Sequence, residues 1–305
     1  MINDYENKLN SNDDYVIDLF GLVKLFWSQR NFIIIFTSLS AILSIFIALS
    51  LPILYKSTAK VFPNSDSMTQ SSSLGSQFGG LASLAGIEIG ASSTEVTLAI
   101  ETMKSYNFFK EYIYDEILPE LSAQKGWSPE NGLEYDETIY NSETNEWIKG
   151  KPSFQDAYRS YNGLVEIAED KLTKIISITV INGSPHVAKN WVDLIIKQIN
   201  MITEKEEIKR ASKALAYYEE KLGSTSLLSL NEMFAKLTED QHKRLMLAEV
   251  EDEYILRTLE PAVAPERRYK PSRAKFCIVF TFIAGVISLI LVFLWDSFRK
   301  SMSDT

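Results

Sequence analysis

The sequence has few of the side chains that disulfides, metal sites and most catalytic centres need. It holds one cysteine, Cys277, and two histidines, His186 and His242, among 305 residues. A single cysteine excludes an intramolecular disulfide framework. Neither histidine stands in an HExxH pattern or beside a cysteine cluster, so we interpret both as surface residues. The sequence therefore predicts no catalytic residue, no cofactor and no metal site.

Basic residues are outnumbered by acids, and the net charge is −9. This excess disfavours nucleic acid as a partner. Acidic runs at residues 204–207 and 249–253 leave open a membrane-bound glycan enzyme that uses acids such as Glu249 and Asp252. We favour solvated helix faces for both runs, with Glu206 and Arg210 paired at i, i+4.

Lysine and arginine are absent from the stretch SLGSQFGGLASLAGIEIG, residues 73–90. A phosphate-binding loop needs a lysine that reaches the terminal phosphates, so this absence excludes a nucleotide site here. Apolar residues recur three apart with small residues between them, which favours a contact with a neighbouring subunit. A flexible loop is the alternative, because glycine and serine are frequent. The predicted contact consists of Phe78, Gly80, Leu81, Leu84, Ala85 and Ile87.

Charge is absent from two long stretches, residues 31–55 and 276–295. Each has the length and composition of a transmembrane helix. The first is not a cleavable signal, because its leader is acidic and its apolar run is too long. Small residues at helical spacing favour close packing of the two spans in lipid, although such residues are common in any membrane helix. This packing set is Ser40, Ser44, Ala48, Ala284, Gly285 and Ser288.

The two spans leave an N-terminal segment, 1–30, a large domain, 56–275, and a tail, 296–305. Because both ends are short, we expect no output domain across the membrane, which excludes a transmembrane receptor. Lysines and arginines near the spans are more frequent on the side of the large domain, so the positive-inside rule places that domain in the cytoplasm. Long domains translocate largely regardless of charge, however, so the rule does not decide the side.

The large domain has the patterns of an α+β fold. Alternating polar and apolar residues predict strands at 55–63 and 174–183, and a third strand is expected at 254–263. Ser92 and Glu95 form a capping-box pattern that opens a helix over 92–118. Residues 122–153 are interrupted by glycine, proline and asparagine, and we expect a surface excursion there.

A long helix is predicted over about 185–222, with Ser184 as its cap and Pro185 in its first position. After the break GSTS, a return helix is predicted over about 227–253. The first carries apolar residues at alternating spacings of three and four, and the second carries apolar residues on one face, which favours an antiparallel helical pair. The residues of this seam are Ile208, Ala211, Leu215, Tyr218, Leu222, Leu230, Phe234, Leu237, Leu245 and Ala248.

Four stretches in the same order resemble the Wzz-type polysaccharide co-polymerases, the O-antigen chain-length determinants. They are DDYVIDLFGLVKLFWSQRNFIIIF with LSLPILYKSTAKVFPN, GLASLAGI with LAIETMKSYNFF, TVINGSPHVAKNWVDLIIKQIN, and RLMLAEVEDEYILRTLEPAVAPERRYKPSRA. The resemblance extends over nearly the whole chain, and residues 122–153 are its least familiar part.

The resemblance implies a two-pass protein of the bacterial inner membrane with cytoplasmic termini and a periplasmic domain, in conflict with the charge rule. It also implies a ring of identical subunits that acts with the membrane O-antigen polymerase on lipid-linked glycan and sets the length of O-antigen, without catalysis. Two alternatives stay open, a scaffold for exopolysaccharide or capsule export and the glycan enzyme. Relatives in capsule export carry a kinase domain after the second span, which we do not expect here.

The approach to the second span, EPAVAPERRYKPSR, contains Pro261, Pro265 and Pro271. Proline lacks an N–H and restrains the residue before it. We expect these prolines to hold the segment extended and to fix how the domain meets the membrane.

Overall fold

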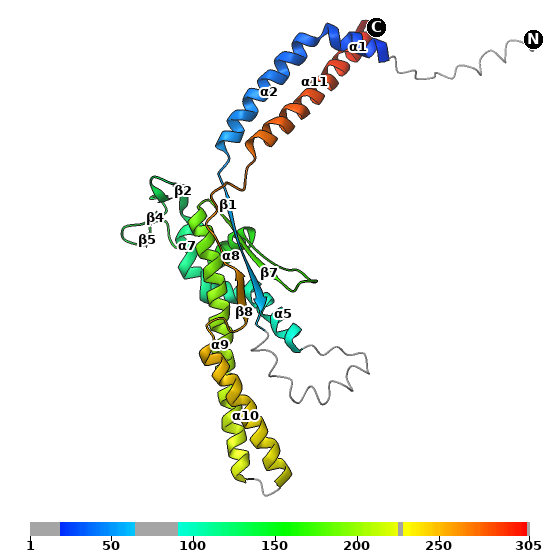
Figure 1. Cartoon of the computed structure of the whole chain (residues 1–305). Helices are drawn as coiled ribbons and strands as arrows, with labels where there is room; N and C mark the ends of the chain where they lie inside the picture. The colour runs from blue at the N-terminus through cyan, green and yellow to red at the C-terminus, as the bar shows by residue number, and fades with distance from the viewer. Residues whose placement is uncertain (1–18, 65–90, 225–227, 304–305) are drawn as a thin grey trace, which may run out of the picture. The chain divides into compact units, whose positions relative to one another are not determined.

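The structure is a computed structural model that describes residues 19–64, 91–224 and 228–303. The chain divides into two compact units (Figure 1). One contains the chain up to Pro52 and from Pro271 onward, and the other contains Ile53–Lys270. We describe each unit by itself.

The first unit consists of helices. It contains α1 (Leu19–Ser28), α2 (Arg30–Ser50) and α11 (Arg273–Ser303), and α2 packs along α11. Arg30–Ser50 and Arg273–Asp296 are candidate membrane spans, with mean hydropathies of 2.6 and 2.9. The predicted first span was too long, because α2 ends at Ser50 and Tyr55 lies in a strand. Pro52 restricts Leu51 to the extended backbone that it adopts, which ends the helix.

A four-stranded antiparallel sheet forms the centre of the second unit. It contains β1 (Tyr55–Pro63), β6 (Val165–Glu169), β7 (Ile176–Asn182) and β8 (Leu256–Glu260), in the order β6-β7-β1-β8. The three predicted strands are confirmed as β1, β7 and β8, although β7 and β8 are shorter than expected. β6 was not predicted, because five residues directly after a helix give little alternation to recognise.

The longest helix covers one face of this sheet. α9 (Pro185–Ser224) packs against β1 and β7. In β1 the alternate residues Ser57, Ala59 and Val61 are buried. The core between helix and sheet consists of apolar side chains from both, including Val61, Ile176, Ile178, Val180, Ala188, Trp191, Val192, Ile195 and Ile199. Burial of this amphipathic face therefore fixes the first half of α9 on the sheet.

The predicted helix 92–118 is broken in the structure. α5 (Ala91–Lys104) is followed by α6 (Tyr106–Phe108), a five-residue π-helix (Phe109–Ile113) and α7 (Tyr114–Ser122). The break falls at Ser105, whose hydroxyl accepts a hydrogen bond from the backbone N–H of Phe108 at 3.1 Å and so starts a new helix. Ser92 is not the cap that the sequence suggests, because α5 already includes it.

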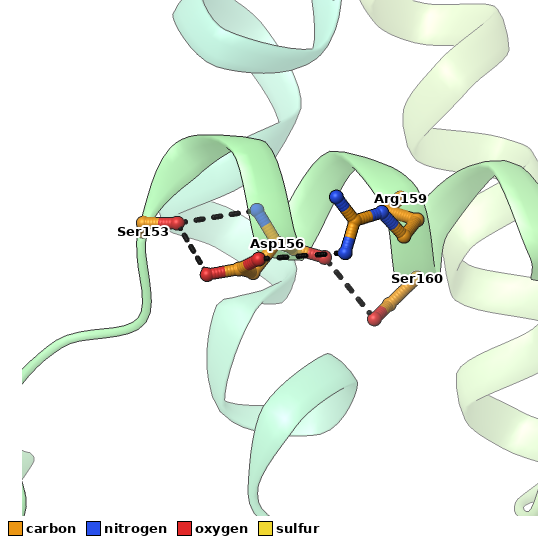
Figure 2. Close-up of polar contacts among 4 residues, drawn as sticks. All are labelled: Ser153, Asp156, Arg159 and Ser160. Carbon is orange, nitrogen blue, oxygen red and sulfur yellow. Dashed lines mark hydrogen bonds and ion pairs between the residues drawn. The ribbon is translucent and has the colours of Figure 1, made fainter.

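The predicted surface excursion contains two small hairpins. One pairs β2 (Gln124–Ser128) with β3 (Gly132–Tyr135), and the other pairs β4 (Tyr140–Asn141) with β5 (Glu146–Trp147). α8 (Phe154–Leu164) follows them. Its N-cap is Ser153, whose hydroxyl accepts from the N–H of Asp156 at 3.2 Å and donates to the Asp156 carboxylate at 2.7 Å (Figure 2). Asp156 also faces Arg159.

The antiparallel helical pair is confirmed. α9 turns back into α10 (Leu228–Val250), and the two helices pack side by side (Figure 1). Ala211, Leu215 and Ala248 of the predicted seam are buried, whereas Leu230 is exposed. The cap of α9 is also confirmed, since the Ser184 hydroxyl accepts from the N–H of Val187 at 3.4 Å. Together with the sheet, this pair confirms the α+β fold class.

Candidate interaction surfaces

The predicted oligomer contact lies outside the described residues. This contact consists of six residues that the structure does not describe, namely Phe78, Gly80, Leu81, Leu84, Ala85 and Ile87. Their role stays a prediction.

The six small residues predicted to pack the spans occupy α2 and α11. Ser44, Ala48, Ala284 and Ser288 are buried, whereas Ser40 and Gly285 are half-buried. The hydroxyl of Ser44 donates to the Ala41 carbonyl, and that of Ser288 donates to the Gly285 carbonyl, each at 2.7 Å. Because both bonds stay within their own helix, these serines act at the contact as small side chains.

No close contact at position 285 requires a glycine there. A Cβ added there would meet the Thr37 methyl carbon at 3.7 Å, which is ordinary van der Waals contact. A Gly285→Ala change is therefore compatible with this geometry.

A buried amide ties the helical hairpin to the chain that returns from it. Asn200 of α9 donates to the Leu256 carbonyl at 3.0 Å and accepts from the N–H groups of Ile255 and Leu256, each at 2.9 Å. Asn200 itself is buried. Three backbone groups at the start of β8 thus depend on one side chain for their hydrogen bonds.

A second buried amide holds the end of α10. The side chain of Asn64, directly after β1, donates to the Glu251 carboxylate and to the Glu253 carbonyl. The backbone N–H of Asn64 donates to the Ile255 carbonyl at 3.0 Å. The turn between α10 and β8 is therefore fixed by β1 as well as by α9.

The proline segment begins where the β8 ladder ends. β8 pairs with β1 as far as Glu260, opposite Lys60, and Pro261 follows. Proline has no N–H to donate to the next ladder position. In place of a ladder bond, the Ser57 hydroxyl donates to the Val263 carbonyl at 2.9 Å. The segment thus follows β1 without being a strand, although the sequence predicts a strand as far as residue 263, and Pro261 is exposed while Pro265 is half-buried.

The seam between α9 and α10 contains a buried carboxylate. Glu207 of α9 lies 2.8 Å from the Arg210 guanidinium and 3.5 Å from that of Arg244 in α10. Arg210 therefore pairs with Glu207 at i, i+3, and its predicted pairing with Glu206 was wrong. A charged group in this position links the two helices where apolar residues form the rest of the contact.

A fourth internal polar contact joins α7 to α9. The indole N–H of Trp191, a buried side chain of the core, donates to the Glu120 carboxylate. Burial raises the pKa of Glu120 above its ordinary value, and the bond from Trp191 opposes that rise. Burial thus favours the protonated form of Glu120 in the folded protein.

The acids considered for glycan chemistry lie on the surface of the second unit. Glu249 and Asp252 are both exposed at the end of α10. Among the described residues, no group of three or more His, Cys, Asp or Glu side chains has metal-binding geometry. His186 and His242 are exposed, as predicted, and the His186 ring lies 6.0 Å from that of Trp127.

Comparison with protein families matches residues 16–116 to the family described as "Wzz: Chain length determinant protein". Comparison with curated proteins finds no match. Among solved structures, the chain is similar to a "full-length bacterial polysaccharide co-polymerase" at 12% identity and a TM-score of 0.42, covering 93% of this chain and 99% of that one. It is also similar to a fragment of WzzB, a polysaccharide co-polymerase from Salmonella Typhimurium, at 13% identity and a TM-score of 0.29, covering 72% and 100%.

The family match includes α1, α2, β1, α5 and α6, and it ends within the first turn of α7. It confirms the resemblance that the motifs in this part of the chain indicate.

Proposed function

From the match of residues 16–116 to the chain length determinant family, we propose that this protein regulates the length of O-antigen in lipopolysaccharide. It does so without catalysis, as a polysaccharide co-polymerase that acts with the membrane O-antigen polymerase. The family match is the observation that carries this proposal.

The described architecture supports a mechanical role. The largest feature of Ile53–Lys270 is a helix of 40 residues paired with a return helix of 23 residues. Three buried polar contacts, at Asn64, Asn200 and Glu207, hold this hairpin together and fix it to the sheet. Such internally bonded elements suit a scaffold that presents a defined surface to other chains.

The proposed setting is the bacterial inner membrane, with two membrane passes, cytoplasmic termini and the large domain in the periplasm. Two candidate spans flank that domain. The partners are further copies of this chain in a ring, the polymerase, lipid-linked glycan and membrane lipid.

A strain lacking this gene tests the proposal. Its lipopolysaccharide, separated on a gel, should lose the clustered distribution of O-antigen lengths, and expression of the full chain should restore it. An unchanged ladder accompanied by loss of exopolysaccharide would contradict length control and favour the export scaffold.

A matched variant separates regulation from catalysis. Glu249→Gln with Asp252→Asn removes the exposed acids that a glycan enzyme would need. The variant should restore the same ladder as the unchanged chain. Loss of all polymer in this variant alone would favour the enzyme.

A further inference from the structure

A cluster of basic side chains lies where the second unit begins and ends. We call Lys56, Arg267, Arg268 and Lys270 the basic collar. The ammonium groups of Lys56 and Lys270 lie 5.3 Å and 5.0 Å from the centre of the Tyr269 ring. Arg267, Arg268, Tyr269 and Lys270 are exposed, and Lys56 is half-buried.

The backbone holds the collar in place. The N–H of Leu54 donates to the Lys270 carbonyl at 2.9 Å, and the N–H of Tyr269 donates to the Leu54 carbonyl at 2.7 Å. This bridge joins the residue before β1 to the end of the proline segment. Lys56 and Lys270, which are distant in the sequence, thus lie beside the same tyrosine ring.

In the described part of the chain, no carboxylate forms an ion pair with any of the four basic residues, whereas Lys60, four residues beyond Lys56, pairs with Glu260 at 2.7 Å. Two lysines beside one ring, with no acid paired to either, form a surface that favours anions.

The chain places this surface next to both candidate spans. Lys56 follows Ser50, the end of α2, by six residues, and Lys270 precedes Arg273, the start of α11, by three. Three residues extend to at most about 11 Å, so the covalent chain keeps Lys270 close to the start of a membrane helix. Tyrosine is enriched at the membrane–water interface, where its ring meets lipid and its hydroxyl meets water.

We propose that the basic collar binds the phosphate groups of anionic phospholipid headgroups at the surface of the bilayer. Lysine and arginine bind phosphate through charge-assisted hydrogen bonds. The binding anchors the second unit at the point where its two chain ends meet. It also gives a reason for the basic residues beside the large domain. If that domain is periplasmic, the positive-inside rule predicts few lysines and arginines there.

Hydrogen–deuterium exchange of the full-length chain in nanodiscs tests this proposal. Nanodiscs of phosphatidylcholine alone are compared with nanodiscs that also contain phosphatidylglycerol. The anionic lipid should slow exchange in peptides covering residues 266–270 by roughly fivefold or more, and high salt should reverse this.

Two variants test the residues. Arg267→Gln with Arg268→Gln changes only exposed side chains and should reduce the protection, and adding Lys56→Gln and Lys270→Gln should abolish it. The matched control removes four positive charges from exposed positions of the helical hairpin, through glutamine at Lys205, Lys209, Lys213 and Lys236. It should retain the protection.

Inorganic pyrophosphate added to phosphatidylcholine nanodiscs distinguishes the source of the phosphate. Protection by pyrophosphate without protection by phosphatidylglycerol would overturn the assignment to the bilayer. Equal exchange in both lipids, or equal loss of protection in the control variant, would also overturn it. These measurements do not depend on O-antigen length, so they can fail while the proposed function holds.

Discussion

At the scale of single residues, the features that organise the second unit are polar side chains placed among apolar ones. Asn200 lies on the same helix as the buried residues Ile196 and Ile199, and Glu207 lies one residue before Ile208 in the predicted seam. A polar residue at a core position is costly unless its hydrogen bonds are satisfied. Sequence periodicity finds the apolar neighbours but cannot supply the partners, because Leu256 and Arg244 lie far away in the chain.

Replacing Asn200 with alanine should destabilise the protein more than any change at a neighbouring surface position. The variant leaves the N–H groups of Ile255 and Leu256 buried without an acceptor, at a cost of about 2–4 kcal/mol. Thermal unfolding of the full chain in detergent measures this. Thr203→Ala is the control, since that hydroxyl bonds only the Ile199 carbonyl of its own helix and should cost under about 1 kcal/mol. Equal losses in the two variants would contradict the role of Asn200.

Glu120 should make stability depend on pH. Burial raises its pKa in the folded protein, so the folded state binds the proton more tightly than the unfolded state. Its contribution to stability is therefore most favourable below the unfolded pKa and is lost as pH rises through the folded pKa. Glu120→Gln keeps an acceptor for Trp191 and removes this dependence. Thermal midpoints should favour the variant at neutral pH and converge on acidification; divergence on acidification would reverse the assigned sign.

At the scale of elements, the sequence predicts regular patterns well and their interruptions poorly. Alternation over residues 55–63 identifies β1, and heptad-like spacing identifies the α9–α10 pair. The sequence predicts one continuous helix over 92–118, because its apolar pattern does not stop at Ser105, where a side chain caps a new helix. Capping by a single hydroxyl is a local event that periodicity does not register. The oligomer contact at 78–87 has no structural description to compare.

Glu207 and Arg244 should be coupled across the hairpin. Glu207→Leu leaves Arg244 partly buried without its carboxylate, and Arg244→Met removes one of the two cations near Glu207. Each single change should cost about 1–3 kcal/mol, and the double variant should cost less than their sum, because a buried pair is worse broken than replaced. Thermal unfolding of the four proteins gives the coupling. Glu206→Gln changes the exposed neighbouring residue and should have almost no effect on the free energy of unfolding. If the losses of the two single variants add up to that of the double variant, Glu207 and Arg244 are not coupled.

The proline segment should affect glycan length through backbone restraint. Pro265→Ala with Pro271→Ala frees the backbone around the collar while keeping the Ser57 bond to Val263. The double variant should shift the O-antigen ladder while its membrane abundance stays close to that of the unchanged chain. A normal ladder at normal abundance would show that the segment is only a tether.

At the scale of the whole molecule, the proposed function and the role of the basic collar both concern the side of the membrane on which Ile53–Lys270 lies. The charge rule and the family resemblance disagree, because the lysines and arginines near the spans cluster on the side of the large domain. The basic collar resolves this disagreement if those residues serve lipid headgroups rather than topology. Direct measurement of the side is therefore the most informative single experiment on the chain.

The sequence favours cysteine labelling for this measurement, since Cys277 is its only cysteine. In a Cys277→Ser background, Leu172→Cys places a thiol at a turn residue that is 92% exposed. A membrane-impermeant maleimide should label it in spheroplasts if the domain is periplasmic, whereas Ser301→Cys in the tail should react only after the membrane is opened. The intact background protein, which has no thiol, should not react at all. Labelling of Ser301→Cys with protection of Leu172→Cys would place the domain in the cytoplasm and overturn both the proposed topology and the explanation that it gives for the basic collar.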